Sequence, residues 1–239
     1  MNYGIQLYGV RDVAKQSLEK AICEVAKLGY ASVEFAGFFD NTAEQINDML
    51  AKNNIAIFGT HSSLKELTED YDNTVKYHKA IGNKYFIIPA HKLRNQQEID
   101  CFVDAVNELY PKLKQEGITL GFHNHAGEFV PNPDGSVAFE QILYRTNIAL
   151  EVDAYWAYVG MGDPIALMER VKDRLIAIHI KDGDSEGNGF PLGMGCAPVK
   201  DMYNFAKDNN IPLVVESETL TPSGIEEARI CIEYLRLKG

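Results

Sequence analysis

Residues 120–130 read Leu-Gly-Phe-His-Asn-His-Ala-Gly-Glu-Phe-Val, which places two histidines and a glutamate at the end of an apolar run. The run over 118–123 has the length and apolar content of a buried β-strand. Side chains alternate between the two faces of a strand, so His123 and His125 share one face if the strand extends that far. Groups that bind metal ions rarely gather at a strand end by chance, and this feature recurs along the chain.

Apolar runs alternate with amphipathic segments from one end of the chain to the other. Ser17 and Gly29 mark the start and stop of a first helix, Thr42 begins a capping box, and Asp163-Pro164 opens a later helix. Eight strands are predicted, over 5–8, 32–35, 55–58, 85–88, 118–123, 148–153, 175–180 and 212–216. Eight helices alternate with them, and strands that are apolar on both faces indicate a parallel sheet covered by helices. This α/β pattern predicts a (β/α)8 TIM barrel, in which functional groups lie at the carboxyl ends of the strands.

The chain has 239 residues, of which 46% are hydrophobic, and both values suit one large globular domain. No linker divides the pattern, so a single TIM-barrel domain over 1–239 is expected. The glycine-rich stretch 182–198 lies between two patterned segments and is interpreted as a functional loop.

Charge and composition exclude several classes of partner. The formal net charge is −11, and the basic residues are dispersed, which disfavours nucleic acid. No apolar run approaches the roughly 18–20 residues that cross a bilayer, and the N-terminus lacks signal-peptide features, so no membrane association is expected. The four cysteines form no Cys-x-x-Cys pair, and free thiols suit the cytoplasmic location that we expect.

Four potential metal ligands fall at the ends of four successive strands: His123, Asp153, His179 and Glu216. Taken singly, Asp153 would be interpreted as a helix cap, and His179 as a core histidine whose hydrogen bonds are satisfied. Their joint position at strand ends favours a metal site, because an ionised carboxylate such as Glu216 needs a partner when buried. Imidazole and carboxylate together favour Mn²⁺, Fe²⁺, Co²⁺ or Zn²⁺ over Ca²⁺.

Further polar residues are predicted at the same mouth of the barrel: Gln6, Glu34, His61, His91, Glu128 and Lys181. Lys181 shares a face with His179 and is expected to hold a substrate oxygen; the alternative is a surface lysine paired with Asp182. For His91 the alternative is a structural or exposed role. Trp156 is expected either to stack on a sugar or to pack the sixth loop.

The chain resembles the sugar phosphate isomerase/epimerase family of xylose isomerase-like TIM barrels. The resemblance runs nearly end to end and rests on these segments: Gly29-Tyr30 with Val33-Glu34-Phe35, Phe122-His-Asn-His-Ala-Gly-Glu-Phe129, Leu150-Glu-Val-Asp-Ala-Tyr-Trp156, Gly162-Asp-Pro164, His179-Ile-Lys-Asp182, Gly193-Met-Gly195 and Val214-Val-Glu216. It implies one divalent metal ion, commonly Mn²⁺, with Zn²⁺, Co²⁺, Fe²⁺ or Mg²⁺ as alternatives. By this resemblance Asp153, His179 and Glu216 are three of its ligands.

One departure concerns the fifth strand, where ketose 3-epimerases place a metal-binding glutamate and this chain has His123, with Glu128 a few residues on. The resemblance implies an isomerase or epimerase that moves a proton on a small keto- or aldo-sugar, phosphorylated or not, through a metal-stabilised enediolate. Glu216 or Glu128 would be the base, His125 or His123 its partner, and Lys181 the anchor for an oxygen. The alternative is a dehydratase or lyase on a keto-sugar or keto-inositol, as in the related inosose dehydratases.

Two other functional classes are less consistent with the sequence. An apurinic endonuclease of this superfamily uses three zinc ions and more histidines than the six present here. A non-catalytic sugar-binding barrel would need no base. Barrels of this kind often dimerise, so a homodimer is the oligomer that the resemblance allows.

Overall fold

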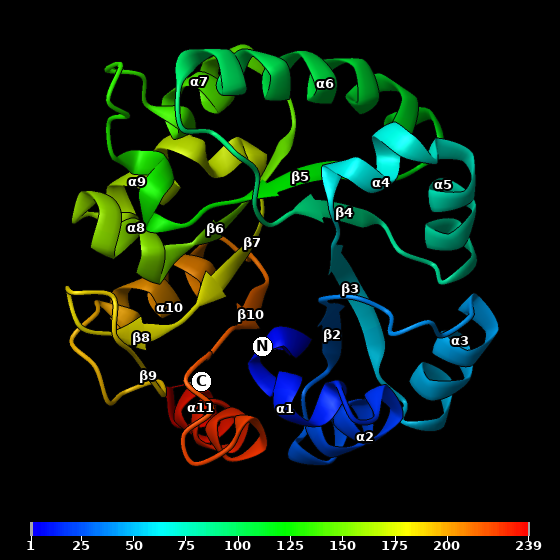
Figure 1. Cartoon of the computed structure of the whole chain (residues 1–239). Helices are drawn as coiled ribbons and strands as arrows, with labels where there is room; N and C mark the ends of the chain where they lie inside the picture. Colours follow the sequence, from blue (N-terminus) through cyan, green and yellow to red (C-terminus); the bar gives the residue numbers. More distant parts are fainter. Residues whose placement is uncertain (1, 239) are drawn as a thin grey trace.

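The computed structural model describes residues 2–238 and shows a closed barrel of parallel strands surrounded by helices (Figure 1). Around the barrel the strands follow the order β1-β10-β7-β6-β5-β4-β3-β2, so each strand pairs with its neighbours in sequence and β10 closes against β1. The (β/α)8 barrel predicted from the sequence is therefore confirmed. The barrel strands are β1 (Tyr3–Gln6), β2 (Ser32–Phe35), β3 (Ala56–His61), β4 (Tyr85–Ile88), β5 (Thr119–His123), β6 (Ala149–Asp153), β7 (Leu175–Ile180) and β10 (Leu213–Val215).

Helices connect the strands and cover the outside of the barrel. The α-helices are α1 (Arg11–Ala14), α2 (Leu18–Leu28), α3 (Ala43–Lys52), α4 (Leu64–Glu69), α5 (Tyr71–Ala80), α6 (Gln96–Gln115), α7 (Ala138–Arg145), α8 (Ala154–Met161), α9 (Pro164–Val171), α10 (Val199–Asp208) and α11 (Gly224–Lys238). Short 3-10 turns occur at η1 (Leu7–Val10), η2 (Ala126–Phe129) and η3 (Lys172–Arg174). None of the helices in the part described is long and apolar enough to cross a membrane.

Helix α2 illustrates how the sequence determines these elements. Ser17 caps its first turn by accepting a hydrogen bond from the Lys20 N–H at 3.2 Å. Its buried residues, including Leu18, Ile22 and Val25, recur at helical spacing and face the barrel. The chain leaves the helix at Gly29, whose φ of +93° favours glycine. Both ends of this helix match the prediction.

Several boundaries differ from the prediction. Strand β1 begins and ends two residues earlier than expected, and Leu7 and Tyr8 belong instead to the 3-10 turn η1. A segment without a predicted helix forms α4, started by a capping box in which Glu66 Oε1 accepts a hydrogen bond from the Ser63 N–H at 2.8 Å. Another unpredicted helix, α8, directly follows Asp153. The carboxyl ends of β2, β4, β5, β6 and β7 match the prediction, whereas β1 ends two residues earlier, β3 three residues later and β10 one residue earlier than predicted.

The loop after β7 is held together by one carboxylate. It contains a small hairpin, β8 (Asp182–Gly183) paired with β9 (Gly189–Phe190). Asp182 is buried and accepts hydrogen bonds from the backbone N–H groups of Gly183 and Gly193 at 2.8 Å, Gly195 at 3.1 Å and Ala197 at 3.2 Å. The predicted functional loop is thus an ordered structure.

The two ends of the chain meet beside the barrel. Helix α11 packs against α1 and α2, as the red and blue helices of Figure 1 show. Within the barrel, Gly9 lies so close to the segment after β10 that a Cβ atom there would be 2.6 Å from the Ser217 carbonyl oxygen. Glycine therefore lets η1 approach this segment and brings Tyr8 to the barrel mouth.

Candidate active site

The four predicted ligands come together at one end of the barrel. His123 and Asp153 end β5 and β6, His179 lies near the end of β7, and Glu216 follows β10. Asp153 is directly opposite His179 in the β6–β7 register. All four side chains are buried, and one potential ligand atom from each lies within 4.8 Å of the others. The strand pattern therefore produces a compact donor set.

Asp153 has one carboxylate oxygen committed to the protein and one that is not. Its Oδ1 accepts a hydrogen bond from the Trp156 N–H at 2.7 Å, which caps α8. Its buried Oδ2 has no hydrogen-bond partner among residues 2–238. Burial raises the pKa of Asp153 to about 7, although the nearby Lys181 acts in the opposite direction. An unsatisfied buried oxygen beside two imidazoles fits a divalent cation.

The two histidines differ in their surroundings. Burial lowers the pKa of His123 to about 3, so its ring is neutral and retains a free nitrogen lone pair. Burial also opposes protonation of His179, but the carboxylates of Glu151, Glu216 and Glu34 outweigh it and hold its pKa well above the usual value. His179 Nδ1 lies 3.0 Å from Glu216 Oε2. So many acidic groups around one ring create a strong demand for positive charge at this point.

A second tier of polar side chains lies next to the donor set. Gln6 Nε2 donates a hydrogen bond to Glu34 Oε2 at 2.8 Å, and the same oxygen lies 2.8 Å from His179 Nε2. His61 Nε2 lies 2.7 Å from Glu151 Oε2. Burial, reinforced by the negative charge of Glu151, raises the pKa of Glu34 to about 7. Three residues predicted at the mouth, Gln6, Glu34 and His61, thus adjoin the donor set.

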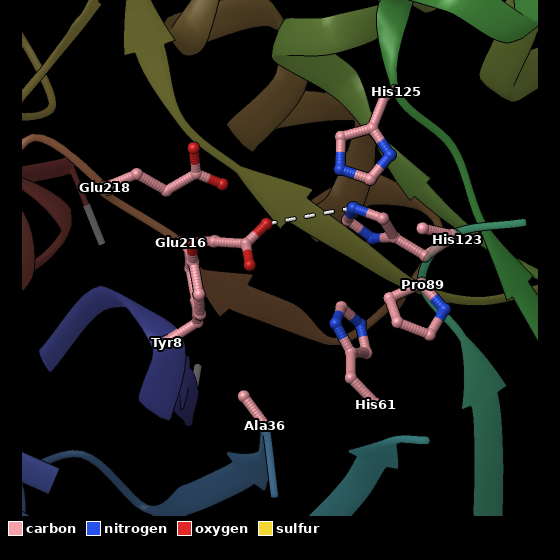
Figure 2. Close-up of a pocket in the computed structure, with 9 residues that line it drawn as sticks. Tyr8, Ala36, His61, Pro89, His123, His125, Glu216 and Glu218 are labelled. Atoms are coloured by element: carbon pink, nitrogen blue, oxygen red, sulfur yellow. Dashed lines mark ion pairs between the residues drawn. The ribbon is translucent and has the colours of Figure 1, made fainter. Parts of the chain in front are cut away.

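A cavity of about 340 Å³ opens above these side chains. It is lined by Tyr8, Ala36, His61, Pro89, Ala90, His123, His125, Glu216 and Glu218. Figure 2 shows Glu216, Glu218 and Tyr8 on one side of the cavity and His125, His123 and His61 on the other. A small molecule in the cavity would therefore lie between acidic groups and imidazoles.

Lys181 lies at the edge of this site. Its side chain is buried, and its Nζ lies 2.7 Å from Glu218 Oε2 and 4.5 Å from the centre of the Trp156 ring. The alternative of a surface lysine paired with Asp182 is wrong, because Asp182 bonds to the backbone of its own loop. Trp156 does not line the cavity, but its ring lies 6.2 Å from that of His125, which does.

Two predicted residues are not brought to the cavity. Glu128 Oε2 accepts a hydrogen bond from the His125 N–H at 2.8 Å, so this glutamate folds back to start the turn η2. Its position three residues after His125 is typical of such a cap. His91 is exposed and packs on Phe102, with the ring centres 5.1 Å apart. Neither residue lines the cavity.

Three residues of the site were missed from the sequence, namely Glu151, Glu218 and Tyr8. Glu151 precedes Asp153 by two positions on the same strand, and Glu218 follows Glu216 by two. Residues two apart on a strand point to the same face. The strand pattern that predicts Asp153 as a ligand therefore also predicts that Glu151 points into the barrel. Tyr8 was assigned to the first strand, but it belongs to the 3-10 turn η1, whose approach to the mouth the strand pattern does not predict.

Comparison with known proteins identifies the relatives of the chain. An inosose dehydratase of Geobacillus kaustophilus is 23% identical over 189 residues, which is 69% of this chain and 61% of that protein. The chain thus matches less than two thirds of that relative's length. A sugar phosphate isomerase/epimerase from Parabacteroides distasonis has a similar structure, with a TM-score of 0.83, 21% identity, and coverage of 98% of this chain and 92% of the other. The D-allulose 3-epimerase from Methylomonas sp. gives a TM-score of 0.70 at 15% identity, with coverage of 100% and 98%.

The family model for xylose isomerase-like TIM barrels matches residues 22–237, which is most of the chain. The match includes every barrel strand except β1, and therefore every strand that contributes to the donor set. The chain belongs to the xylose isomerase-like TIM barrel family.

Proposed function

We propose that this protein is a divalent-metal-dependent isomerase or epimerase that acts on a small keto- or aldo-sugar. The observation that carries the proposal is the convergence of His123, Asp153, His179 and Glu216 beneath a cavity of about 340 Å³. A cavity of this size suits a small ligand, and its mixture of acidic groups and imidazoles suits proton transfer. The relatives whose names include sugar isomerases and epimerases support the same class of reaction.

The donor set would hold the cation through two imidazole nitrogens and two carboxylates. This combination suits Mn²⁺, Fe²⁺, Co²⁺ or Zn²⁺. The resemblance to the sugar phosphate isomerase/epimerase family makes Mn²⁺ the first choice, and Mg²⁺ is a further alternative. When bound, such a cation polarises a carbonyl group and thereby makes a proton on the neighbouring carbon more acidic. Asp153 contributes Oδ2, a buried oxygen without a hydrogen-bond partner among residues 2–238.

The proton carriers are the groups on the two sides of the cavity. Glu216 and Glu218 lie on one side and His125 on the other, so a substrate carbon between them can lose a proton to one group and receive one from the opposite group (Figure 2). Glu218 and His125 are free of the proposed ligand set, which makes them the better pair. Lys181, 2.7 Å from Glu218, would hold a substrate oxygen and balance the glutamate's charge.

The second candidate function is a dehydratase acting on a keto-sugar or keto-inositol. The curated relatives named inosose dehydratase favour it. The first step, removal of a proton next to a carbonyl, would use the same groups. The outcomes differ afterwards, because a dehydratase expels a hydroxyl group from the neighbouring carbon, whereas an epimerase returns the proton.

The test is a screen of keto- and aldo-sugars with Mn²⁺ in deuterated buffer, read by NMR and mass spectrometry. Carbon-bound deuterium in an isomeric product supports the isomerase or epimerase, and a product lighter by one water supports the dehydratase. Asp153→Asn, which retains an oxygen for the cap of α8, is the matched control and should be inactive. Both candidate functions are contradicted if the protein binds metal and sugars but no sugar in the screen exchanges a carbon-bound proton or loses water. The protein would then be a non-catalytic sugar-binding barrel.

A further inference from the structure

One buried carboxylate oxygen contacts three histidines at once. Glu151 Oε2 lies 2.7 Å from His61 Nε2, 3.1 Å from His179 Nε2 and 3.3 Å from His123 Nδ1. All four side chains are at least nine-tenths buried. One carboxylate oxygen of Glu151 therefore faces a ring nitrogen of each of the three histidines.

The other ring nitrogens of two of these histidines face the proposed metal site. His179 Nδ1 lies 3.0 Å from Glu216 Oε2, and His123 Nε2 lies 3.8 Å from the same oxygen. Figure 2 marks this second ion pair. Each imidazole thus has one nitrogen toward Glu151 and the other toward the donor set.

The backbone places this glutamate by an irregularity of the barrel. The β6–β7 register shifts between Leu150 and Glu151, and on the opposite side of the barrel the β2–β3 register shifts between Val33 and Glu34. A register shift redirects the side chain beside it. Glu151 is also directly opposite His123 in the β5–β6 register. Both features hold its carboxylate against the inner side of the histidines.

We propose that Glu151 is a positioning residue that fixes the ring orientation and tautomer of His123 and His179 for one divalent cation. The inference rests on the proposed function, because it takes these two histidines as ligands. A carboxylate that accepts the N–H of a ligating imidazole leaves the opposite nitrogen with its lone pair and makes that nitrogen more basic. Here one oxygen of Glu151 lies 3.1 Å from His179 Nε2 and 3.3 Å from His123 Nδ1, so a single carboxylate faces two proposed ligands from two strands.

The rival explanation is a second cation held by His61, His123, Glu151 and His179, which also form a compact group. This group and the proposed donor set share His123 and His179. A neutral imidazole has one nitrogen lone pair to donate, since the other nitrogen carries a proton. Occupation of both groups would require both shared rings to be fully deprotonated. The geometry therefore assigns one cation to each chain, bound by the donor set. In this assignment His61 and Glu151 position the ligands and hold no second cation.

Glu34 provides an internal comparison. Its Oε2 lies 2.8 Å from His179 Nε2 and 3.2 Å from His61 Nε2, so it contacts only one of the two proposed ligands. Removal of its charge should therefore weaken metal binding less than removal of the charge of Glu151. Glu227 is a buried glutamate that has no hydrogen bond or ion pair with the donor set among residues 2–238; its carboxylate accepts hydrogen bonds from Ser217, Thr219 and Leu220.

The experiment is a titration of the full chain with Mn²⁺, followed by calorimetry and elemental analysis, for the wild type, Glu151→Gln, Glu34→Gln and Glu227→Gln. We expect one Mn²⁺ per wild-type chain, an affinity roughly 10–100-fold lower in Glu151→Gln, a smaller loss in Glu34→Gln and none in Glu227→Gln. The visible spectrum of the Co²⁺-loaded protein should also change in Glu151→Gln, which a purely structural role would not produce. If Glu151→Gln fails to fold, Glu151→Asp replaces it in the titration. The shorter side chain keeps the negative charge but moves the carboxylate away from the histidines, so this variant should also bind Mn²⁺ more weakly.

The outcomes separate this inference from the proposed function. Wild-type affinity and an unchanged Co²⁺ spectrum in the Glu151 variants would overturn the inference alone. Two cations per wild-type chain, with one lost in His61→Ala, would replace it with the second site. A wild type that binds no cation would remove both the metal site and the role of Glu151.

Discussion

Asn124 and Asp153 join the ends of β5 and β6 by a reciprocal pair of hydrogen bonds. Asn124 Nδ2 donates to the Asp153 carbonyl oxygen at 3.1 Å, and the Asp153 N–H donates to Asn124 Oδ1 at 3.2 Å. Both residues are buried, so no water replaces these bonds if they are lost. Because Asn124 follows His123, the pair also fixes the distance between two proposed ligands.

Asn124→Ala should therefore lower the free energy of unfolding by about 2 kcal/mol, since it leaves a buried N–H and a buried C=O without partners. Chemical denaturation of the metal-free protein measures this. Asn107→Ala is the control, because Asn107 is exposed and donates one hydrogen bond to the Arg145 carbonyl. Equal stability of the two variants would show that the pair contributes little.

The fold and the donor set were largely predictable because both depend on the same alternation of strands and helices. That alternation fixes where a strand ends, and strand ends meet at one mouth of a parallel barrel. The roles that could not be predicted depend on contacts between distant segments. The sequence predicts Glu128 as a catalytic base, but its carboxylate caps the local turn by accepting the His125 N–H. Glu218 reaches Lys181 only because β10 pairs with β7 in the folded barrel.

Asp153→Asn should abolish the stabilisation of the protein by Mn²⁺. In the wild type, a cation at a concentration of 100 times its Kd raises the free energy of unfolding by about 2.7 kcal/mol. The variant loses the charge that draws the cation to the site but can keep the cap on α8, because the amide oxygen still accepts the Trp156 N–H. Thermal unfolding with and without Mn²⁺ measures the effect, and an equal shift in both proteins would exclude Asp153 as a ligand.

His78 should make stability depend on pH below neutrality. Its ring is buried, and Asn83 Nδ2 lies 2.9 Å from His78 Nδ1, which accepts the hydrogen bond in the neutral ring. Burial lowers its pKa from 6.5 to about 4. Between these values the unfolded chain binds more protons than the folded chain, so the folded state loses stability as the pH falls from 6.5 toward 4.

Replacement of His78 by Gln should remove this contribution. The slope of the unfolding free energy against pH should become smaller by up to about 1.4 kcal/mol per pH unit in that window. Urea denaturation at several pH values, compared between the wild type and the variant, gives the difference directly. Parallel curves for the two proteins between pH 4 and 6.5 would show that His78 titrates alike in both states.

Asp182 should control the order of the loop over 183–197. Its carboxylate accepts four backbone hydrogen bonds, and the loop folds so tightly around it that a Cβ atom on Gly195 would lie 2.2 Å from Asp182 Oδ1. Hydrogen bonds to a buried charged acceptor contribute more than neutral ones. Asp182→Ala should therefore lower the free energy of unfolding by about 3 kcal/mol or more.

The same substitution should also expose the loop to proteases, because the backbone N–H groups that lose their acceptor would hydrogen-bond to water instead. Limited proteolysis with mass spectrometry locates the cleavage, and Asp173→Ala, on the turn η3, is the control. Cleavage within 183–197 at the wild-type rate would mean that the hairpin and its packing, and not this carboxylate, hold the loop beside Lys181.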